Sequence, residues 1–164
     1  MINLYLGGTR SGKSRRALDE AKTGIFLATA EVMDDEFRIR IQHHKDERGH
    51  EWLTKECPLD LKGALEEHNT SDSKMLIDCL TVWLGNLMHY KKSIDKEVQE
   101  LVEVLVGFKG DVFLVSNEVG QGVVPEHPMG REFRDHQGRL NQSIAAIADR
   151  VELLVAGIPL VVKS

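Results

Sequence analysis

The sequence predicts an α/β fold in which a mostly parallel β-sheet is covered by helices on both faces. Short apolar runs alternate with longer segments of mixed polarity, and the apolar runs are continuous instead of alternating with polar residues. A continuous apolar run indicates a strand that is buried on both faces, and the segments between the runs are long enough to be crossover helices. We expect the 164 residues to form one domain, 1–164, which is long enough to bury a core without disulfides or metals.

Three strands and three helices are expected in the first half of the chain. The predicted strands are apolar runs at residues 2–6 (INLYL), 24–29 (GIFLAT) and 74–80 (KMLIDCL). The predicted helices cover residues 13–22, 34–45 and 59–68. Asp34 and Arg38 form an i,i+4 pair of opposite charge, which is typical of an exposed helix. Residues 46–60 are predicted to be irregular because Pro58 breaks regular structure.

The second half of the chain is predicted to continue the alternation. Helices are expected at residues 81–90, 94–108 and 131–150, and strands at residues 111–116, 151–155 and 160–162. Leu101, Val104 and Leu105 would share one face of the second of these helices. Residues 117–130 are rich in glycine and proline, which predicts a loop long enough to serve as a lid or a substrate-binding element.

Composition excludes several classes of protein. The net charge of −5 argues against a dedicated nucleic-acid-binding protein. No apolar run approaches 18 residues, so no membrane span is expected, and the apolar run at the N-terminus is too short for a signal peptide. Cys57 and Cys79 form no CxxC or zinc pattern, and two thiols of this kind suit a reducing cytoplasm. We therefore expect a cytoplasmic protein.

The strongest motif is the segment GGTRSGKS, which matches G-x-x-x-x-G-K-[ST] at Gly7, Gly8, Thr9, Arg10, Ser11, Gly12, Lys13 and Ser14. It follows a predicted strand and opens a predicted helix, which is the context of a phosphate-binding P-loop. The glycines let backbone N–H groups curl around phosphate oxygens, and the helix N-terminus adds partial positive charge. Lys13 is expected to reach the β- and γ-phosphates, and Ser14 to bind Mg²⁺. The predicted fold is therefore of the P-loop NTPase type, with a nucleoside triphosphate as ligand.

A P-loop also needs an acid on a neighbouring strand to hold Mg²⁺ or its water. Asp78, at the end of the predicted strand MLID, is the candidate, although it is also placed to cap the helix that follows. Asn117 and Glu118 follow another strand and are expected at the same sheet edge, where ligands of open α/β sheets collect.

The P-loop leaves the reaction open among a small-metabolite kinase, a nucleotidyltransferase and a GTP-binding switch protein. The guanine-reading N-K-x-D motif of switch GTPases is missing, because Glu118 follows Asn117. This absence disfavours the switch protein. Arginines of the helix predicted at residues 131–150 either contact phosphates or form surface pairs.

Three of the seven histidines lie within the segment IQHHKDERGH. In a helix, the side chains of His43 and His44 point about 100° apart, so they cannot easily chelate one ion together. A histidine packed on an amphipathic helix is a second interpretation. A third is a nucleophile, since a neutral imidazole can attack an α-phosphate and carry the nucleotide as a phosphoramidate, helped by Lys45 and Arg48. The residues alone do not choose between the last two.

Five segments carry a resemblance to a known family: GGTRSGKSRRA (7–17), LATAEVMDDEFRIRIQHHKDER (27–48), W-x-T-x-E-C (52–57), LVSNEVGQGVVPE (114–126) and REFRDHQGRLNQ (131–142). On these segments the sequence resembles, nearly end to end, the bifunctional adenosylcobinamide kinase / adenosylcobinamide-phosphate guanylyltransferases of cobalamin biosynthesis. The paired histidines followed by Lys-Asp, together with the SNEVG-x-G-x-VPE loop, are specific to that family.

The resemblance implies that His44 becomes guanylylated and that residues 7–14 hold the nucleotide phosphates. It also implies a GTP site lined by Ala28, Thr29, Ala30, Lys45, Asp46, Glu47, Arg48, Glu56 and Asp78. The family has glutamate where this sequence has Asp78, so the role of Asp78 in base contact or in metal binding stays open. The implied substrates are GTP, ATP and adenosylcobinamide or its phosphate, with Mg²⁺. The implied assembly is a homo-trimer or a multiple of it.

Overall fold

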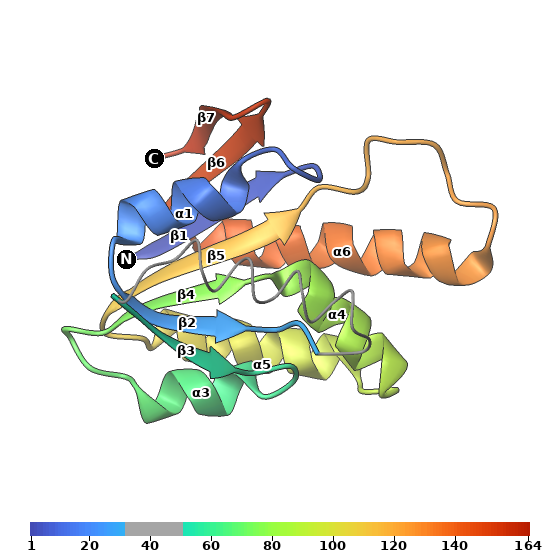
Figure 1. The fold of residues 1–164 in the computed structure, drawn as a ribbon. Coiled ribbons are helices and arrows are strands. Elements are labelled where there is room, and N and C mark those ends of the chain that lie inside the picture. The colour runs from blue at the N-terminus through green and yellow to red at the C-terminus, as the bar shows by residue number, and fades with distance from the viewer. Residues whose placement is uncertain (32–50) are drawn as a thin grey trace.

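The computed structural model describes residues 1–31 and 51–164. Its strands are β1 (Ile2–Gly7), β2 (Gly24–Ala28), β3 (Trp52–Glu56), β4 (Lys74–Asp78), β5 (Asp111–Asn117), β6 (Arg150–Val155) and β7 (Ile158–Lys163). These strands form one sheet in the order β3-β2-β4-β5-β1-β6-β7 (Figure 1). Only the β6–β7 pair is antiparallel within this sheet. The predicted α/β fold with a mostly parallel sheet is confirmed.

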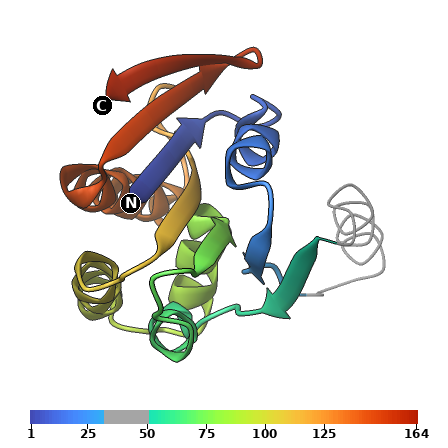
Figure 2. The same cartoon turned by 90° about the vertical axis from the view of Figure 1, so that its left-hand side faces the viewer.

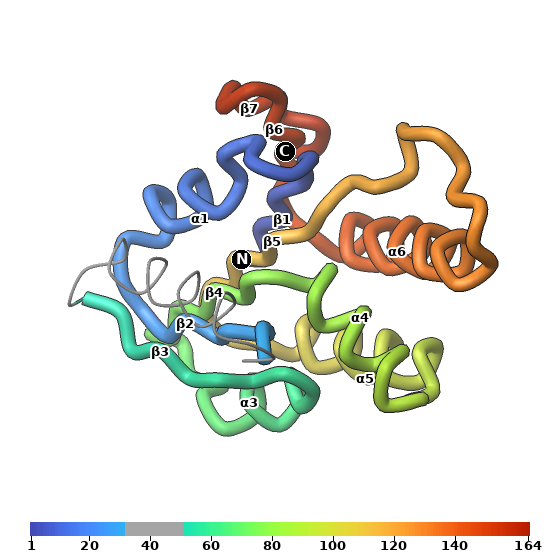
Figure 3. The backbone as a smooth tube through the Cα atoms, turned by 45° about the vertical axis from the view of Figure 1, so that its right-hand side comes forward, coloured from blue at the N-terminus to red at the C-terminus, as the bar shows by residue number. Residues whose placement is uncertain are grey.

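Helices cover both faces of the sheet. The described helices are α1 (Lys13–Ala21), α3 (Leu61–Glu67), α4 (Leu80–His89), α5 (Ile94–Val106) and α6 (Pro128–Ile147). Seen from the side, α1 lies on one face of the sheet and α3 to α6 lie on the other (Figure 2). The tube view shows the same two layers (Figure 3). The helix predicted at residues 34–45 lies outside the described residues.

Alternate residues of each central strand enter two separate cores. On β4, Leu76 packs in the smaller core with Ala17 and Ala21 of α1. Its neighbours Met75 and Ile77 are buried in the larger core beneath α3 to α6. Because both sets of side chains are apolar, the strand appears in the sequence as an unbroken apolar run. The prediction of a sheet buried on both faces rests on this pattern and is confirmed.

The prediction of irregular structure over residues 46–60 is wrong for residues 52–56 and holds for residues 57–60. Trp52–Glu56 forms β3, which pairs in parallel with β2 at the edge of the sheet. The strand is short and carries charged residues, and its Leu53 is exposed. An edge strand is buried less than a central one, so the sequence shows no apolar run there.

The bounds of the last long helix also differ from the prediction of 131–150. Helix α6 begins at Pro128, whose fixed φ suits the first helical position, and the side chain of His127 accepts a hydrogen bond from the backbone N–H of Met129. The helix ends at Ile147, because the Asp149 N–H donates to the Ile2 carbonyl at 2.8 Å and starts the pairing of β6 with β1. Sheet pairing therefore stops the helix three residues before the predicted end.

A buried carboxylate ties α1 to β6. Glu152 is 1% exposed, and its oxygens accept hydrogen bonds from Arg16 Nε at 2.8 Å and from Arg150 Nη2 at 2.7 Å. The hydrogen bonds from Arg16, then those from Arg150, hold the pKa of Glu152 below its ordinary value despite burial. Arg16 stands in the first turns of the helix that the P-loop opens, so this cluster fixes that helix over the sheet.

We predict that Glu152→Gln lowers the free energy of unfolding at neutral pH by about 2 kcal/mol, because charged hydrogen bonds to two arginines are weakened. Since the folded-state pKa of Glu152 is depressed, its contribution is complete above the unfolded pKa of about 4.3 and is lost as the pH falls through the folded value. Urea unfolding at several pH values measures both effects. The difference between wild type and variant should shrink below about pH 4. The exposed Glu103→Gln serves as control, and equal effects of the two variants would contradict the assignment.

Candidate nucleotide-binding site

The P-loop lies at the carboxyl edge of the sheet, between β1 and α1. Gly7 ends β1, and Gly12, with φ of +93°, precedes the first residue of α1. A Cβ atom on Gly7 would collide with the Ser11 side chain and would lie 2.8 Å from the Leu154 carbonyl oxygen. The motif therefore has glycine at the places where the chain is crowded or left-handed. The strand–loop–helix context predicted from the sequence is confirmed.

Lys13 is held inside this loop. Its Nζ atom donates to the Gly8 carbonyl at 3.0 Å, and the residue is 8% exposed. Burial lowers the pKa of Lys13, while the nearby Cys79 and Asp78 act in the opposite direction. The Lys13 amine therefore lies against the loop, where a phosphate oxygen can replace the Gly8 carbonyl as its hydrogen-bond acceptor. Ser14 follows in the first turn of α1 and is partly exposed.

Three of the predicted nucleotide-site residues come together at the same edge. Ala28 on β2 is paired in register with Glu56 on β3 and with Asp78 on β4. Ala28 packs in the core beneath α1, so its register partners also project from the face of the sheet that carries α1 and the P-loop. Parallel pairing therefore places Glu56 and Asp78 on the P-loop side of the sheet, although 21 residues separate them in sequence.

Two details of the Asp78 prediction are corrected. Its strand β4 is not a direct neighbour of the P-loop strand, because β5 lies between β4 and β1. Asp78 is also not the N-cap of α4, which begins at Leu80 with Cys79 in the capping position. The carboxylate still lies close enough to act on the Lys13 amine. A role for Asp78 at the phosphate end of the site stays a prediction.

Thr29 follows β2 and is completely buried. Its hydroxyl donates to the Cys79 carbonyl at 2.9 Å and accepts from the Cys79 N–H at 2.8 Å. Its carbonyl accepts a hydrogen bond from Asn86 Nδ2 at 2.8 Å. Thr29 thus links the ends of β2 and β4 and supports Ala30 and Asp78 beside it. Contacts of Ala28, Thr29 and Ala30 with a nucleotide stay predictions.

The loop after β5 starts next to the P-loop. Gly7 pairs with Asn117, and the Glu118 N–H donates to the Gly7 carbonyl at 3.0 Å. The expectation that Asn117 and Glu118 share the sheet edge with the P-loop is confirmed. Further along, Arg134 donates to the Gly120 carbonyl at 2.7 Å. This arginine of α6 therefore holds the loop after β5, and a contact of Arg134 with phosphate stays a prediction.

A buried polar network supports the end of β5. Ser116 Oγ lies 2.6 Å from Asn141 Oδ1 and accepts from Gln137 Nε2 at 2.9 Å. Asn141 Nδ2 donates to the Asn117 carbonyl at 3.0 Å. Neither Gln137 nor Asn141 was predicted from the sequence to support the site. Their i,i+4 spacing on the core face of a predicted helix is the signal that was available.

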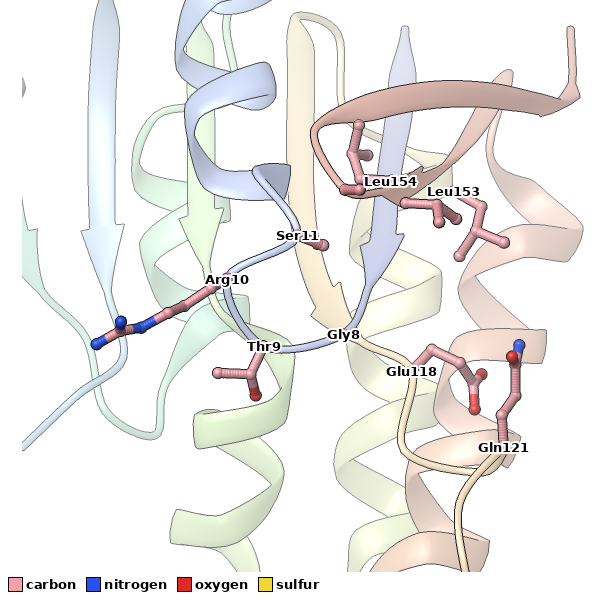
Figure 4. A pocket seen from close by; sticks show the side chains of 10 residues that line it. Gly8, Thr9, Arg10, Ser11, Glu118, Gln121, Leu153 and Leu154 are labelled. Atoms are coloured by element: carbon pink, nitrogen blue, oxygen red, sulfur yellow. The ribbon is translucent and has the colours of Figure 1, made fainter.

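A pocket of about 440 Å³ adjoins the P-loop on the side of β6 (Figure 4). It is lined by Gly8, Thr9, Arg10, Ser11, Glu118, Gln121, Leu153, Leu154, Val155 and Ala156. Its volume falls in the range of about 300–1,000 Å³ that is usual for small-molecule sites. The end of β6 was not predicted to belong to the site, because a buried apolar strand shows no chemical motif in the sequence.

The proposed nucleophile lies outside the described residues. His44, Lys45, Asp46, Glu47 and Arg48 all fall in the segment 32–50. Within residues 1–31 and 51–164, no cluster of three or more histidine, cysteine, aspartate or glutamate side chains could hold a metal ion. In the same ranges, no helix combines the length and hydropathy needed to span a bilayer.

Comparison with known proteins decides the family. The model of the family described as cobinamide kinase / cobinamide phosphate guanyltransferase matches residues 3–162. The chain belongs to this family. It is therefore an enzyme of the kinase and nucleotidyltransferase class, which removes the switch protein from the alternatives. The resemblance inferred from the five sequence segments is confirmed.

Curated relatives match along their whole length. The chain is 39% identical to the bifunctional adenosylcobalamin biosynthesis protein CobU of Salmonella typhimurium, with 99% of this chain and 100% of that protein covered. It is 41% identical to the corresponding protein CobP of Pseudomonas aeruginosa, with 99% and 98% covered. A solved structure from Pyrococcus horikoshii OT3 has a TM-score of 0.53 at 9% identity, covering 100% of this chain and 86% of that one, and supports the fold alone.

We predict that Thr29→Val lowers the free energy of unfolding by about 2 kcal/mol, because the partly buried N–H and carbonyl of Cys79 each lose a hydrogen bond to the Thr29 hydroxyl. Thr29→Ser keeps the hydroxyl and should retain most of the stability. Urea unfolding compares the three proteins. Equal stability of Thr29→Val and wild type would show that the hydroxyl does not hold the two strand ends together.

Proposed function

We propose that this enzyme phosphorylates adenosylcobinamide with a nucleoside triphosphate and then transfers GMP from GTP to the new phosphate, giving adenosylcobinamide-GDP. The observation that carries the proposal is the complete P-loop, with Lys13 buried in it and with Glu56 and Asp78 facing the same side of the sheet. The names of the full-length relatives, which describe bifunctional proteins of adenosylcobalamin biosynthesis, support it.

In the kinase step, the P-loop backbone and Lys13 would hold the triphosphate. The acceptor hydroxyl attacks the γ-phosphorus, the bond to the β,γ-bridging oxygen breaks, and the nucleoside diphosphate leaves with that electron pair. Lys13 neutralises charge that develops on the β- and γ-phosphate oxygens. The N-terminus of α1 adds its partial positive charge on the same side. These contacts reach only phosphates, so they accept ATP and GTP alike.

Ser14 and Asp78 are the residues that would hold Mg²⁺. The donor set fits: Mg²⁺ in phosphotransferases binds one or two protein oxygens and completes its shell with substrate phosphates and water, so no larger protein cluster is required. The Ser14 hydroxyl lies in the first turn of α1, and the Asp78 carboxylate acts on the Lys13 amine from the end of β4. When bound, the ion would neutralise phosphate charge.

In the second step, a neutral nitrogen of His44 would attack the α-phosphorus of GTP. The bond to the α,β-bridging oxygen breaks and pyrophosphate leaves, which gives a guanylyl-histidine. An oxygen of the corrinoid phosphate then attacks the same phosphorus, and the imidazole leaves. Lys45 and Arg48, close to His44 in sequence, would balance the charge of the phosphates. Glu56 would lie on the nucleoside side of the bound GTP. For Asp78, contact with the base is the alternative to the Mg²⁺ role given above.

Incubation with GTP labelled in the α-phosphate should produce an acid-labile, alkali-stable label on the wild-type protein. Mass analysis should locate one GMP adduct on the peptide that contains HHKD. His44→Ala should carry no label, because no nitrogen remains at the attacking position, whereas His43→Ala serves as the matched control and should be labelled. Label that persists in His44→Ala would overturn the covalent assignment.

A small-metabolite kinase without a covalent step is the remaining alternative enzyme. Such an enzyme would transfer a γ-phosphate and release no pyrophosphate from GTP. A pyrophosphate assay in the presence of the phosphorylated corrinoid therefore separates the two reactions. We further propose that the enzyme works in the cytoplasm, where its nucleotide substrates are made.

We propose a homo-trimer or a multiple of it as the assembly. The outer strand β7 supports association, because Ile158, Leu160 and Val162 are 59–70% exposed on an unpaired sheet edge of the described chain. Replacing Leu160 and Val162 by lysine should shift the mass measured by light scattering toward that of one chain. Val106→Lys changes an equally exposed residue at the end of α5 and should leave the mass unchanged. An unaltered assembly in the double variant would exclude β7 from the interface.

A further inference from the structure

The pocket beside the P-loop has two chemically different walls. Leu153, Leu154 and Val155, at the end of β6, form an apolar wall. Opposite them lie the P-loop backbone from Gly8 onward and the polar side chains at the start of the loop after β5 (Figure 4). Such a pocket suits an alkyl chain that carries a hydroxyl group, since the chain can pack on the apolar wall while the hydroxyl meets the polar one.

Two polar side chains are directed at this space. Ser11 is 8% exposed, and its Oγ atom has no hydrogen-bond partner among the described residues. In Figure 4 the Ser11 side chain points to the side of Leu153 and Leu154, whereas Arg10 points away from them. A buried hydroxyl without a partner costs free energy, so its orphan state indicates a ligand that completes it.

Glu118 is the carboxylate of the pocket. Its backbone is anchored to the P-loop by the hydrogen bond from its N–H to the Gly7 carbonyl, 3.0 Å long. One carboxylate oxygen, Oε1, accepts a hydrogen bond from the Gly120 N–H. The other oxygen has no hydrogen bond within the described part of the chain, and the side chain is partly exposed. Glu118 is therefore held in place and still has an oxygen with which to accept a proton.

The apolar wall of the pocket lies on the opposite side of the P-loop strand from the predicted nucleoside site, while Glu118 follows β5, which stands between β4 and the P-loop strand. Ala28, Glu56 and Asp78 stand at the ends of β2, β3 and β4, whereas the pocket is bounded by the end of β6. Strand β1, with the P-loop at its end, lies between these two parts of the sheet. A triphosphate in the P-loop whose nucleoside lies over β2 to β4 would direct its γ-phosphate to the pocket.

From this arrangement we propose that the pocket receives the hydroxyl-bearing alkyl end of the phosphoryl acceptor and that Glu118 is the base that activates it. The inference rests on the kinase step of the proposed function and adds the acceptor site and a catalytic residue. Ser11 orients the hydroxyl by a hydrogen bond, and the wall formed by Leu153 and Val155 packs on the alkyl chain.

The proton and electron pairs balance in this step. As the acceptor oxygen forms its bond to the γ-phosphorus, the hydroxyl proton moves to Glu118 Oε2. The bond to the β,γ-bridging oxygen breaks, and its electron pair leaves with the nucleoside diphosphate beside Lys13. The protonated Glu118 then releases its proton to solvent, which the partial exposure of the side chain permits.

Glu118→Gln tests the base. General base catalysis contributes about 10²–10⁴-fold, so kcat for corrinoid phosphorylation should fall at least about 100-fold, while the KM for the acceptor changes little. Formation of the GMP adduct from GTP and guanylyl transfer to a corrinoid that already carries phosphate should be unchanged. Glu126→Gln removes a charge from the same loop outside the pocket and should behave as wild type. Undiminished kcat in Glu118→Gln overturns the assignment.

Val155→Trp tests the occupant of the pocket. The exposed position tolerates a larger side chain, which should narrow the pocket and raise the KM for the corrinoid while the Kd for nucleotide stays at the wild-type value. A weaker nucleotide Kd with an unchanged corrinoid KM would show that the pocket holds the nucleoside and would overturn the proposal. Val106→Trp, at an equally exposed position on α5, is the control.

Failure of the inference can be told from failure of the proposed function. If the wild-type enzyme phosphorylates no corrinoid under conditions in which it binds nucleotide, the kinase step itself is wrong and the base assignment falls with it. If wild type and Glu118→Gln phosphorylate the corrinoid at the same rate, only the base assignment is wrong. Equal melting temperatures of the two proteins show that the comparison is made between folded enzymes.

Discussion

The parallel pairing of β1 with β5 and β6 is the constraint on which the site depends. Parallel strands end at the same edge, so Gly7 comes to lie beside Asn117 on one side and Leu154 on the other. The P-loop therefore starts between the loop after β5 and the β6–β7 turn. Every wall of the pocket follows from these two pairings, because each of the three strands contributes residues at its carboxyl end or directly after it.

The P-loop is also held from both sides by backbone hydrogen bonds. The Glu118 N–H binds the Gly7 carbonyl at 3.0 Å, and the Gly157 N–H binds the Ser11 carbonyl at 2.9 Å. Ala156 and Gly157 both have positive φ, which gives the tight two-residue turn that brings this N–H to the loop. The same turn leads into the exposed strand β7. Any contact made by β7 is thus only a few residues from the phosphate-binding loop.

Some features could be predicted from sequence because they are encoded locally. The continuous apolar runs identified the central strands, and the complete motif identified the P-loop together with the strand before it and the helix after it. Other features depend on partners distant in sequence. The sequence of β3 is short and polar and gives no strand signal by itself. The segment becomes a strand because its backbone forms hydrogen bonds with β2. The end of α6 is set by the hydrogen bond from the Asp149 N–H to the Ile2 carbonyl. Ile2 is far from residue 149 in the sequence, so the residues around 149 do not reveal this end.

The sequence by itself determined the fold class, the phosphate-binding loop and the family, since each is written in contiguous residues whose spacing carries the chemistry. Only the tertiary structure decided which residues surround that loop. It gave Thr29 a supporting role between two strand ends, placed β5 between Asp78 and the P-loop strand, and brought Leu153 to Val155 opposite Glu118. The physical reason is that strand order and register are set by packing across the whole sheet, whereas a motif specifies only its own backbone.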